Sequence, residues 1–92
     1  MISANEYFDA TVKSLGYENG GKSTIGVMEP GEYEFGTGAA EIMTVIEGEL
    51  VALLPDASDW VSFKAGTSFN VPANSSFKVK AVGQTSYLCK YL

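Results

Sequence analysis

The sequence is divided into short runs of apolar and β-branched residues, each of which ends at a turn signal. In the run from Phe77 to Ala81, apolar residues alternate with Lys78 and Lys80, which is typical of a strand with one buried face. Such runs recur about every 8–12 residues, and no window shows the apolar repeat of an amphipathic helix. The pattern predicts eight or nine strands in a sandwich or barrel. The expected strands lie at 11–15, 24–28, 33–35, 41–47, 50–54, 60–63, 67–71, 77–81 and 85–91, and residues 16–22 are expected to form a flexible loop.

The length of the chain restricts it to one domain. A chain of 92 residues lies near the lower end of the usual domain size and has enough surface to bury for a single core. Its hydrophobic fraction is 46% and its charged fraction is 18%, which is the composition of a folded protein rather than of a disordered one. We therefore expect residues 1–92 to form a single all-β domain.

The charge balance excludes two classes of partner. The chain has six lysines, no arginine and eleven carboxylates, which gives a net charge of −5. Nucleic acids and anionic membranes are both bound through basic surfaces, so we expect neither as a partner. No run of 18 apolar residues is present to span a bilayer, and the first residues lack the basic and apolar regions of a signal peptide.

Cysteine and histidine usage favours a reducing compartment and argues against thiol catalysis. Cys89 is the sole cysteine, so the chain cannot form an internal disulfide, and we expect a cytoplasmic protein. Cys89 lies in an apolar run, and the chain has no histidine that could activate a thiol. We therefore expect Cys89 to be a buried, unreactive side chain.

Two stretches, in order along the chain, keep the spacing of a pair of known motifs. In the first, Gly31 opens the stretch, and Glu41 is followed by six residues and Gly48. In the second, residues 66–77 run glycine, five residues, Pro-x-Asn, two residues and phenylalanine. Asn74 takes the place of a glycine, and asparagine tolerates the left-handed backbone better than most residues. Together the stretches resemble the two motifs of the cupins, which implies an all-β, cupin-type jelly-roll barrel of short antiparallel strands.

The departure from the cupin pattern concerns the metal site. The resemblance implies a cluster of three histidines and one glutamate in metal-binding cupins, whereas this chain contains no histidine. Glu41 is the only residue left of that set, and Phe77 stands where the last histidine would be. Because one carboxylate cannot hold a transition metal tightly, we expect no metal ion.

A narrower resemblance extends over nearly the whole chain. It is carried by Asn5-Glu6-Tyr7-Phe8, Gly31-Glu32-Tyr33, residues 41–46, Leu54-Pro55-Asp56-Ala57, Asp59-Trp60, Phe69-Asn70-Val71-Pro72 and residues 85–92. In these segments the sequence resembles the small pyrimidine/purine nucleoside phosphorylase family of metal-free, single-domain cupins. The resemblance implies reversible cleavage of diverse nucleosides by phosphate to free base and pentose 1-phosphate. It also implies nucleosides and inorganic phosphate as partners, phosphate as a co-substrate without any cofactor, and a homodimer.

Without arginine or histidine, phosphate would have to be bound by lysine, hydroxyl groups or backbone N–H groups. Lys22, Ser23 and Thr24 form the first candidate site, because the preceding Gly20-Gly21 pair would let backbone approach an anion closely. Lys90 is the second candidate, in the last expected strand. The alternative for both lysines is a solvated surface charge.

One carboxylate and several aromatic residues complete the expected site. Glu41 is the predicted catalytic residue, because a carboxylate inside the barrel could accept hydrogen bonds from ribose hydroxyls and stabilise a cationic transition state. Its alternative is a buried structural glutamate, and the alternative for the aromatic residues is plain core packing. The predicted nucleoside-binding residues are Tyr33, Met43, Phe69, Phe77 and Tyr87.

Two other functions remain open from the residues alone. The barrel without histidines is compatible with a non-catalytic sugar- or nucleotide-binding cupin, and also with a structural module that packs into a dimer. Release of base that depends on phosphate would separate the phosphorylase from both. Stabilisation by a ligand without turnover would select the binding protein.

Overall fold

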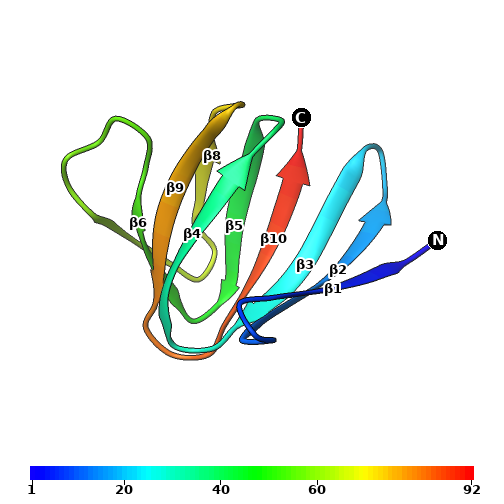
Figure 1. The fold of residues 1–92 in the computed structure, drawn as a ribbon, viewed down its shortest axis with the longest axis horizontal. Helices are drawn as coiled ribbons and strands as arrows, with labels where there is room; N and C mark the ends of the chain where they lie inside the picture. The colour runs from blue at the N-terminus through cyan, green and yellow to red at the C-terminus, as the bar shows by residue number, and fades with distance from the viewer.

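The computed structural model describes residues 1–92 and consists of ten β-strands joined by turns and short loops (Figure 1). It contains no helix of the length and hydrophobicity needed to cross a membrane. The strands are β1 (Ser3–Tyr7), β2 (Val12–Glu18), β3 (Lys22–Met28), β4 (Gly31–Thr37), β5 (Glu41–Glu47), β6 (Glu49–Leu53), β7 (Val61–Lys64), β8 (Ser68–Val71), β9 (Ser75–Ala81) and β10 (Thr85–Tyr91).

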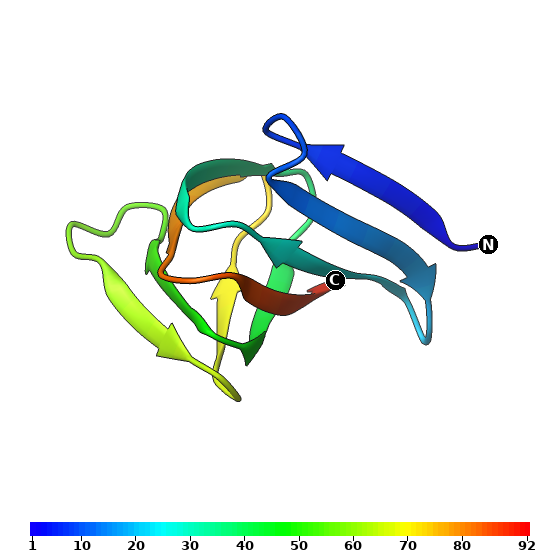
Figure 2. The ribbon, with the colours of Figure 1, turned by 90° about the horizontal axis from the view of Figure 1, so that it is seen from below.

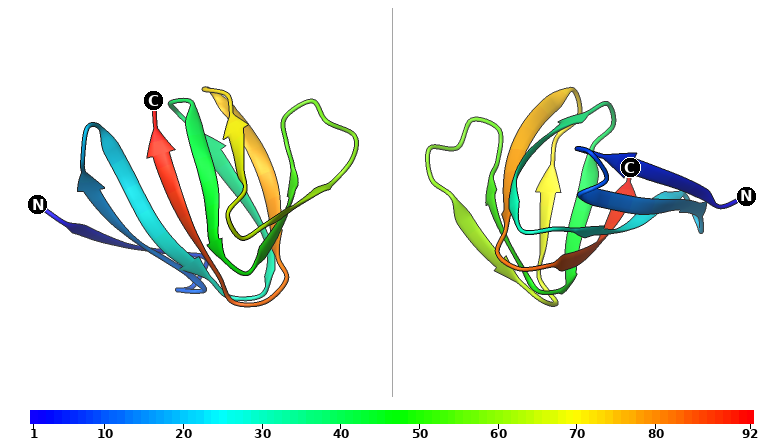
Figure 3. Two further views of the ribbon diagram at one scale, coloured as in Figure 1. Left: turned by 180° about the vertical axis from the view of Figure 1, so that it is seen from behind. Right: turned by 60° about the horizontal axis from the view of Figure 1, so that its bottom comes forward.

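The strands form two antiparallel sheets that face each other. One sheet has six strands in the order β1-β2-β3-β10-β5-β8, and the other has four in the order β4-β9-β6-β7. Figure 2 shows the β1–β2 hairpin extending to one side of the two sheets. Viewed from behind, β10 lies between β3 and β5 (Figure 3). The all-β prediction is confirmed, and the two sheets form a jelly-roll barrel.

Period-two alternation places the core between the sheets. In β5, Glu41, Met43 and Val45 are buried, whereas Ile42 and Thr44 between them are more exposed. In β9, apolar residues point inward and Lys78 and Lys80 point outward, as the sequence predicts. Fourteen buried hydrophobic residues from both sheets form one contiguous cluster.

The prediction of a flexible loop at residues 16–22 is wrong. β2 continues to Glu18 and β3 begins at Lys22, so that only a tight turn separates them. Gly16 lies within β2, at a position where no side chain fits: a Cβ atom there would come within 2.6 Å of the Ser3 hydroxyl on β1. This glycine permits a close approach between strands rather than marking a loop.

The β1–β2 turn has an unusual backbone. Phe8, Asp9 and Ala10 all have positive φ, at 52°, 56° and 67°. Each such residue costs roughly 1–2 kcal/mol when it is not glycine. The Thr11 hydroxyl and amide both donate hydrogen bonds to the Phe8 carbonyl, at 2.6 and 3.2 Å, and so close the turn.

Asn74 and Gly48, two of the motif positions, have positive φ angles. Asn74 has φ of 55°, which confirms that it takes the left-handed conformation predicted for the position of the motif glycine. Gly48 has φ of +100°, and a Cβ atom there would meet the Thr85 hydroxyl at 2.6 Å and the Gln84 carbonyl oxygen at 3.1 Å. The spacing between Glu41 and Gly48 is therefore the length of β5. The strand ends in a turn that only glycine can adopt.

Candidate active site

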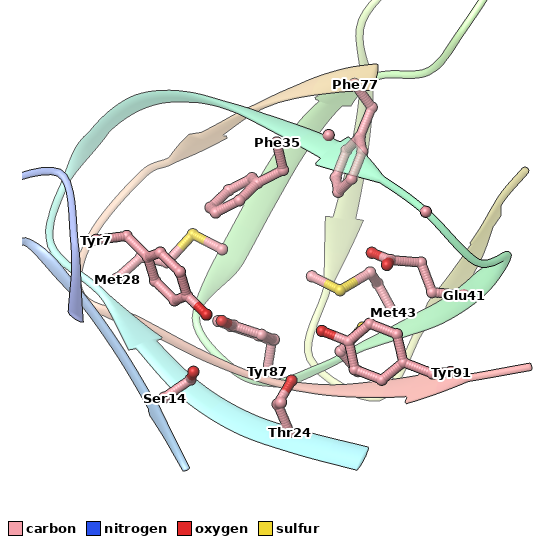
Figure 4. A pocket seen from close by; sticks show the side chains of 13 residues that line it. Tyr7, Ser14, Thr24, Met28, Phe35, Glu41, Met43, Phe77, Tyr87 and Tyr91 are labelled. Atoms are coloured by element: carbon pink, nitrogen blue, oxygen red, sulfur yellow. The ribbon is translucent and has the colours of Figure 1, made fainter. Parts of the chain in front are cut away.

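A pocket with a volume of about 180 Å³ opens between the two sheets (Figure 4). Ligand pockets for drug-sized molecules typically have about 300–1,000 Å³, so this one suits a small molecule rather than a dinucleotide. The lining residues are Tyr7, Ser14, Thr24, Met28, Phe35, Gly36, Gly38, Glu41, Met43, Phe77, Tyr87, Cys89 and Tyr91.

Glu41 is the only carboxylate in the lining of the pocket. It is the first residue of β5 and only 7% exposed, opposite Tyr91 on β10. Burial raises the pKa of Glu41 above its usual value of 4.5, and a hydrogen bond from the Cys89 thiol partly opposes that rise. A carboxylate held with little solvent interacts strongly with any positive charge that develops beside it.

The remaining polar side chains of the lining are hydroxyls and one thiol. Burial raises the pKa of Cys89 and of Tyr91 to about 12 each, and it raises the pKa of Tyr87 as well. All three groups therefore stay protonated near neutral pH, as Ser14 and Thr24 do. The prediction that Cys89 is a buried free thiol is confirmed.

One end of the pocket lies close to a positive charge. The Lys22 ammonium lies 5.0 Å from the centre of the Tyr91 ring, which is cation–π distance. The hydroxyls of Tyr91 and Thr24 both line the pocket at this end, and Thr24 is only 6% exposed. Lys22 and Thr24 lie on the same face of β3, because they are two residues apart on the strand, but Lys22 is exposed at the strand end and does not line the pocket.

The structure brings five of the predicted site residues together in the pocket: Thr24, Glu41, Met43, Phe77 and Tyr87. Whether they bind nucleoside or phosphate stays a prediction.

Two predicted aromatic residues pack elsewhere in the core. The Tyr33 hydroxyl donates a hydrogen bond of 2.6 Å to the Glu29 carbonyl. The Phe69 ring packs between Phe63, with centroids 4.5 Å apart, and Phe77, at 6.2 Å. Both side chains support the pocket wall from behind instead of lining it.

Two of the four predicted phosphate residues lie on the opposite face of the sheet. Ser23 and Lys90 are directly paired between β3 and β10. Neither lines the pocket, and both alternate with the pocket residues Thr24 and Tyr91 along their strands, although Ser23 itself is only 3% exposed. The Lys90 ammonium donates a hydrogen bond of 2.7 Å to the Asn19 carbonyl. Three consecutive strand residues cannot all face one ligand, which the expectation for residues 22–24 overlooked.

The pocket also has lining residues that sequence reasoning missed, and two of them carried a usable signal in the sequence. Cys89 and Tyr91 follow Tyr87 at two-residue spacing on β10, so they share its face. Phe35 is paired directly with Phe77. Tyr7 had no such signal, because β1 is exposed along almost its whole length and shows no apolar alternation. The other missed residues are Ser14, Met28, Gly36 and Gly38.

Gly26 leaves the space that the Tyr87 ring occupies. A Cβ atom at Gly26 would lie only 2.5 Å from atoms of that ring. We expect Gly26→Ala to push the ring into the pocket and to lower the free energy of unfolding by about 1–3 kcal/mol, as overpacking of a core usually does. Urea denaturation measures this loss, and Gly83→Ala, with open space around it, is the control. Equal stability of the two variants would contradict the close packing.

Comparison with known proteins places the chain in a family. The family model for pyrimidine/purine nucleoside phosphorylase matches residues 2–91. A protein of that name from Pseudomonas fluorescens is 56% identical and covers 99% of this chain and 98% of its own. Another from Tolumonas auensis is 53% identical, with 99% of each chain covered.

Solved structures agree on the fold. A protein of unknown function from Vibrio parahaemolyticus is 47% identical and superposes with a TM-score of 0.96 over 100% of this chain and 99% of its own. An RmlC-like cupin from Shewanella frigidimarina, 18% identical, superposes with a TM-score of 0.77 over 97% of this chain and 81% of its own. The latter supports the cupin-type fold alone. The chain therefore belongs to the pyrimidine/purine nucleoside phosphorylase family, which is a family of enzymes.

Proposed function

We propose that this protein is a nucleoside phosphorylase of broad specificity, which cleaves purine and pyrimidine nucleosides reversibly with phosphate. The full-length identity to relatives named for this activity supports the reaction class. The observation that carries the proposal is the single buried carboxylate, Glu41, in a pocket whose other polar side chains are neutral hydroxyls and a thiol.

In the proposed reaction, an oxygen of phosphate forms a bond to the anomeric carbon while the bond from that carbon to the base nitrogen breaks. The electron pair of the broken bond leaves with the base, which takes up the proton that hydrogen phosphate gives up, and the sugar becomes pentose 1-phosphate. Positive charge develops on the sugar in the transition state. The Glu41 carboxylate stabilises that charge and accepts hydrogen bonds from the ribose hydroxyls. No step uses a metal ion, since a lone carboxylate beside a protonated thiol is a poor ligand set for one.

Phosphate is proposed to bind where Lys22 and Thr24 lie on the same face of β3. Lys22 supplies the positive charge, and the hydroxyls of Thr24 and Tyr91 supply neutral hydrogen bonds. Ser23 and Lys90, which do not line the pocket, are left out of this assignment. Because the net charge of −5 repels an anion at long range, the attraction must come from these few groups at short range.

The first test is to incubate the protein with uridine or adenosine, with and without phosphate, and to measure free base by chromatography. We expect base only with phosphate. Release of base without phosphate would indicate a hydrolase instead. If no base is released but the nucleoside raises the melting temperature, the protein is a non-catalytic binding cupin.

Replacement of Lys22 tests the phosphate assignment. We expect Lys22→Ala to raise the KM for phosphate about 10- to 100-fold, because a hydrogen bond to a charged group contributes about 1.5–3 kcal/mol, while the KM for uridine stays the same. Lys78→Ala, an exposed lysine on the outer face of β9, is the matched control. Equal KM values for phosphate in both variants would refute the assignment.

We also propose a cytoplasmic homodimer. The outer face of the six-stranded sheet carries Leu15, Ile25 and Leu88 directly opposite one another on β2, β3 and β10. Leu15 is 51% exposed and Ile25 is 41% exposed, which makes this row an apolar patch that a second copy would cover. The free thiol of Cys89 fits a reducing cytoplasm.

A charge in the apolar row tests the dimer. We expect wild type to sediment as a dimer and Ile25→Lys as a monomer, because the substitution would bury an unpaired charge at the interface. Val61→Lys changes a residue of similar exposure on β7, in the other sheet, and should remain dimeric. A monomeric wild type would contradict the proposal.

A further inference from the structure

The pocket has two chemically different ends. In Figure 4, Glu41 and Tyr91 lie at one end, whereas Tyr7, Met28 and Phe35 lie at the other. The first end is the one that lies close to Lys22. The second end has no charged group and is formed by two aromatic rings and a thioether. An apolar, aromatic end suits a flat ring system rather than a sugar or an anion.

Tyr7 reaches this end through the register of the β1–β2 hairpin, because it is paired with Val12, whose side chain is fully buried on the inner face. Consecutive strand residues normally point to opposite faces, yet Tyr7 lines the pocket and Phe8 packs on the same inner aromatic cluster. The left-handed backbone at residues 8–10 makes this possible. The Phe8 ring lies 5.2 Å from the Tyr33 ring and meets the Phe35 ring edge-on at 5.4 Å. These contacts offset the strain and fix the end of the hairpin against the barrel.

The polar groups near this end are all hydroxyls. The Tyr7 hydroxyl points toward that of Tyr87, and Ser14 lies nearby (Figure 4). Each hydroxyl can donate or accept a hydrogen bond, since it rotates to suit its partner. No amide or charged side chain is present at this end to impose a fixed pattern of donors and acceptors.

We propose that Tyr7 binds the nucleobase, with its hydroxyl on the base edge, and that Phe8 is the positioning residue that holds Tyr7 over the pocket. This inference rests on the proposed phosphorolysis and names the residues that hold the leaving base. A hydroxyl that serves as donor or acceptor pairs with purine and pyrimidine edges alike. Broad base tolerance follows from the absence of groups of fixed polarity.

Kinetics on single variants test the assignment. We expect Tyr7→Phe to lower kcat/KM for both uridine and adenosine about 3- to 10-fold, as loss of one hydrogen bond does, with the KM for phosphate unchanged. Phe8→Ala should lower nucleoside kcat/KM at least as much, and Phe8→Tyr, which keeps the ring, should restore it. Tyr17→Phe, in β2 outside the pocket lining, is the control. Wild-type kinetics in Tyr7→Phe, or an equal rise in the KM for phosphate, would overturn the proposal.

A binding measurement separates this inference from the reaction itself. Adenine and uracil at millimolar concentration should raise the melting temperature of wild type and of Tyr17→Phe, and Tyr7→Ala should lose that shift. If wild type released no base but adenine still stabilised it through Tyr7, the base site would stand and the phosphorylase proposal would fall. An equal shift in Tyr7→Ala and wild type would refute the base site.

Discussion

Glu41→Gln is expected to lower kcat about 10²- to 10³-fold while leaving the protein at least as stable as wild type. The loss of activity follows from removal of a charge that stabilises the cationic sugar, an effect of the size seen for other preorganised electrostatic groups. Glutamine keeps the shape and hydrogen-bonding capacity of the side chain, so the pocket itself should persist. Steady-state phosphorolysis of uridine measures the change.

The stability half of this prediction follows from the raised pKa of Glu41. A carboxyl group whose pKa is higher in the folded than in the unfolded state binds its proton more tightly when folded. That contribution to stability is fully present below the unfolded pKa and is lost as pH rises through the folded pKa. At pH 7 the ionised Glu41 is therefore destabilising, and glutamine removes the penalty. We expect an equal or higher melting temperature for Glu41→Gln at pH 7.

The pH dependence of activity should run opposite to that of stability, with activity rising as pH rises. The carboxylate form is the active one, so kcat should fall as pH drops through the pKa of Glu41, which lies above 4.5. Glu47→Gln, at the exposed end of the same strand, is the matched control and should resemble wild type in both activity and stability. An active Glu41→Gln, or one that loses activity only because it unfolds, would contradict the role given to Glu41.

Gly48→Ala is expected to lower the free energy of unfolding by about 3 kcal/mol or more. The φ of +100° strains any side chain, which costs about 1–3 kcal/mol by itself. The added Cβ would also press on the Thr85 hydroxyl at 2.6 Å and on backbone of Gln84 and Thr85 at 3.1 Å. Because Gly48 is held between β5 and β6 and Thr85 is the first residue of β10, this contact cannot relax without moving strand backbone.

Urea denaturation with the far-UV signal of the strands measures this loss as a lower midpoint at an unchanged slope. Gly83→Ala adds the same methyl group where nothing lies within 4 Å, and it should change stability little. Should Gly48→Ala unfold at the same midpoint as Gly83→Ala, the tight turn between β5 and β6 would not be a constraint on this fold.

Much of the fold could be predicted because alternation and turn signals are local. The bounds of β5 and β10 agree with the predicted 41–47 and 85–91, and Asn74 has the predicted left-handed backbone. β1 was missed as a strand, since its side chains are almost all exposed and their polarity carries no period. Residues 16–22 were misassigned because a glycine that permits close strand contact has the same sequence signature as a glycine in a turn.

The site was harder to predict than the fold, for a physical reason. The cupin motif spacing predicted Glu41 and Phe77 inside the barrel, and both line the pocket. Tyr7, by contrast, reaches the pocket through its pairing with the buried Val12, and the turn of three left-handed residues that follows it contains no glycine. Such a conformation depends on tertiary contacts of Phe8 with rings on another strand, and no local pattern encodes it.

The position of β10 in the sheet determines when the protein can fold during its synthesis. This strand follows both of its neighbours in the sequence, yet it lies between them and joins β1-β2-β3 to β5-β8. Until it has emerged from the ribosome, the six-stranded sheet is two separate pieces with unpaired inner edges. The pairing of β3 with β10 closes a loop of more than fifty residues, a long-range contact of the kind that slows folding. Folding should therefore follow synthesis rather than accompany it, and the nascent chain would expose two open strand edges to other chains in the meantime.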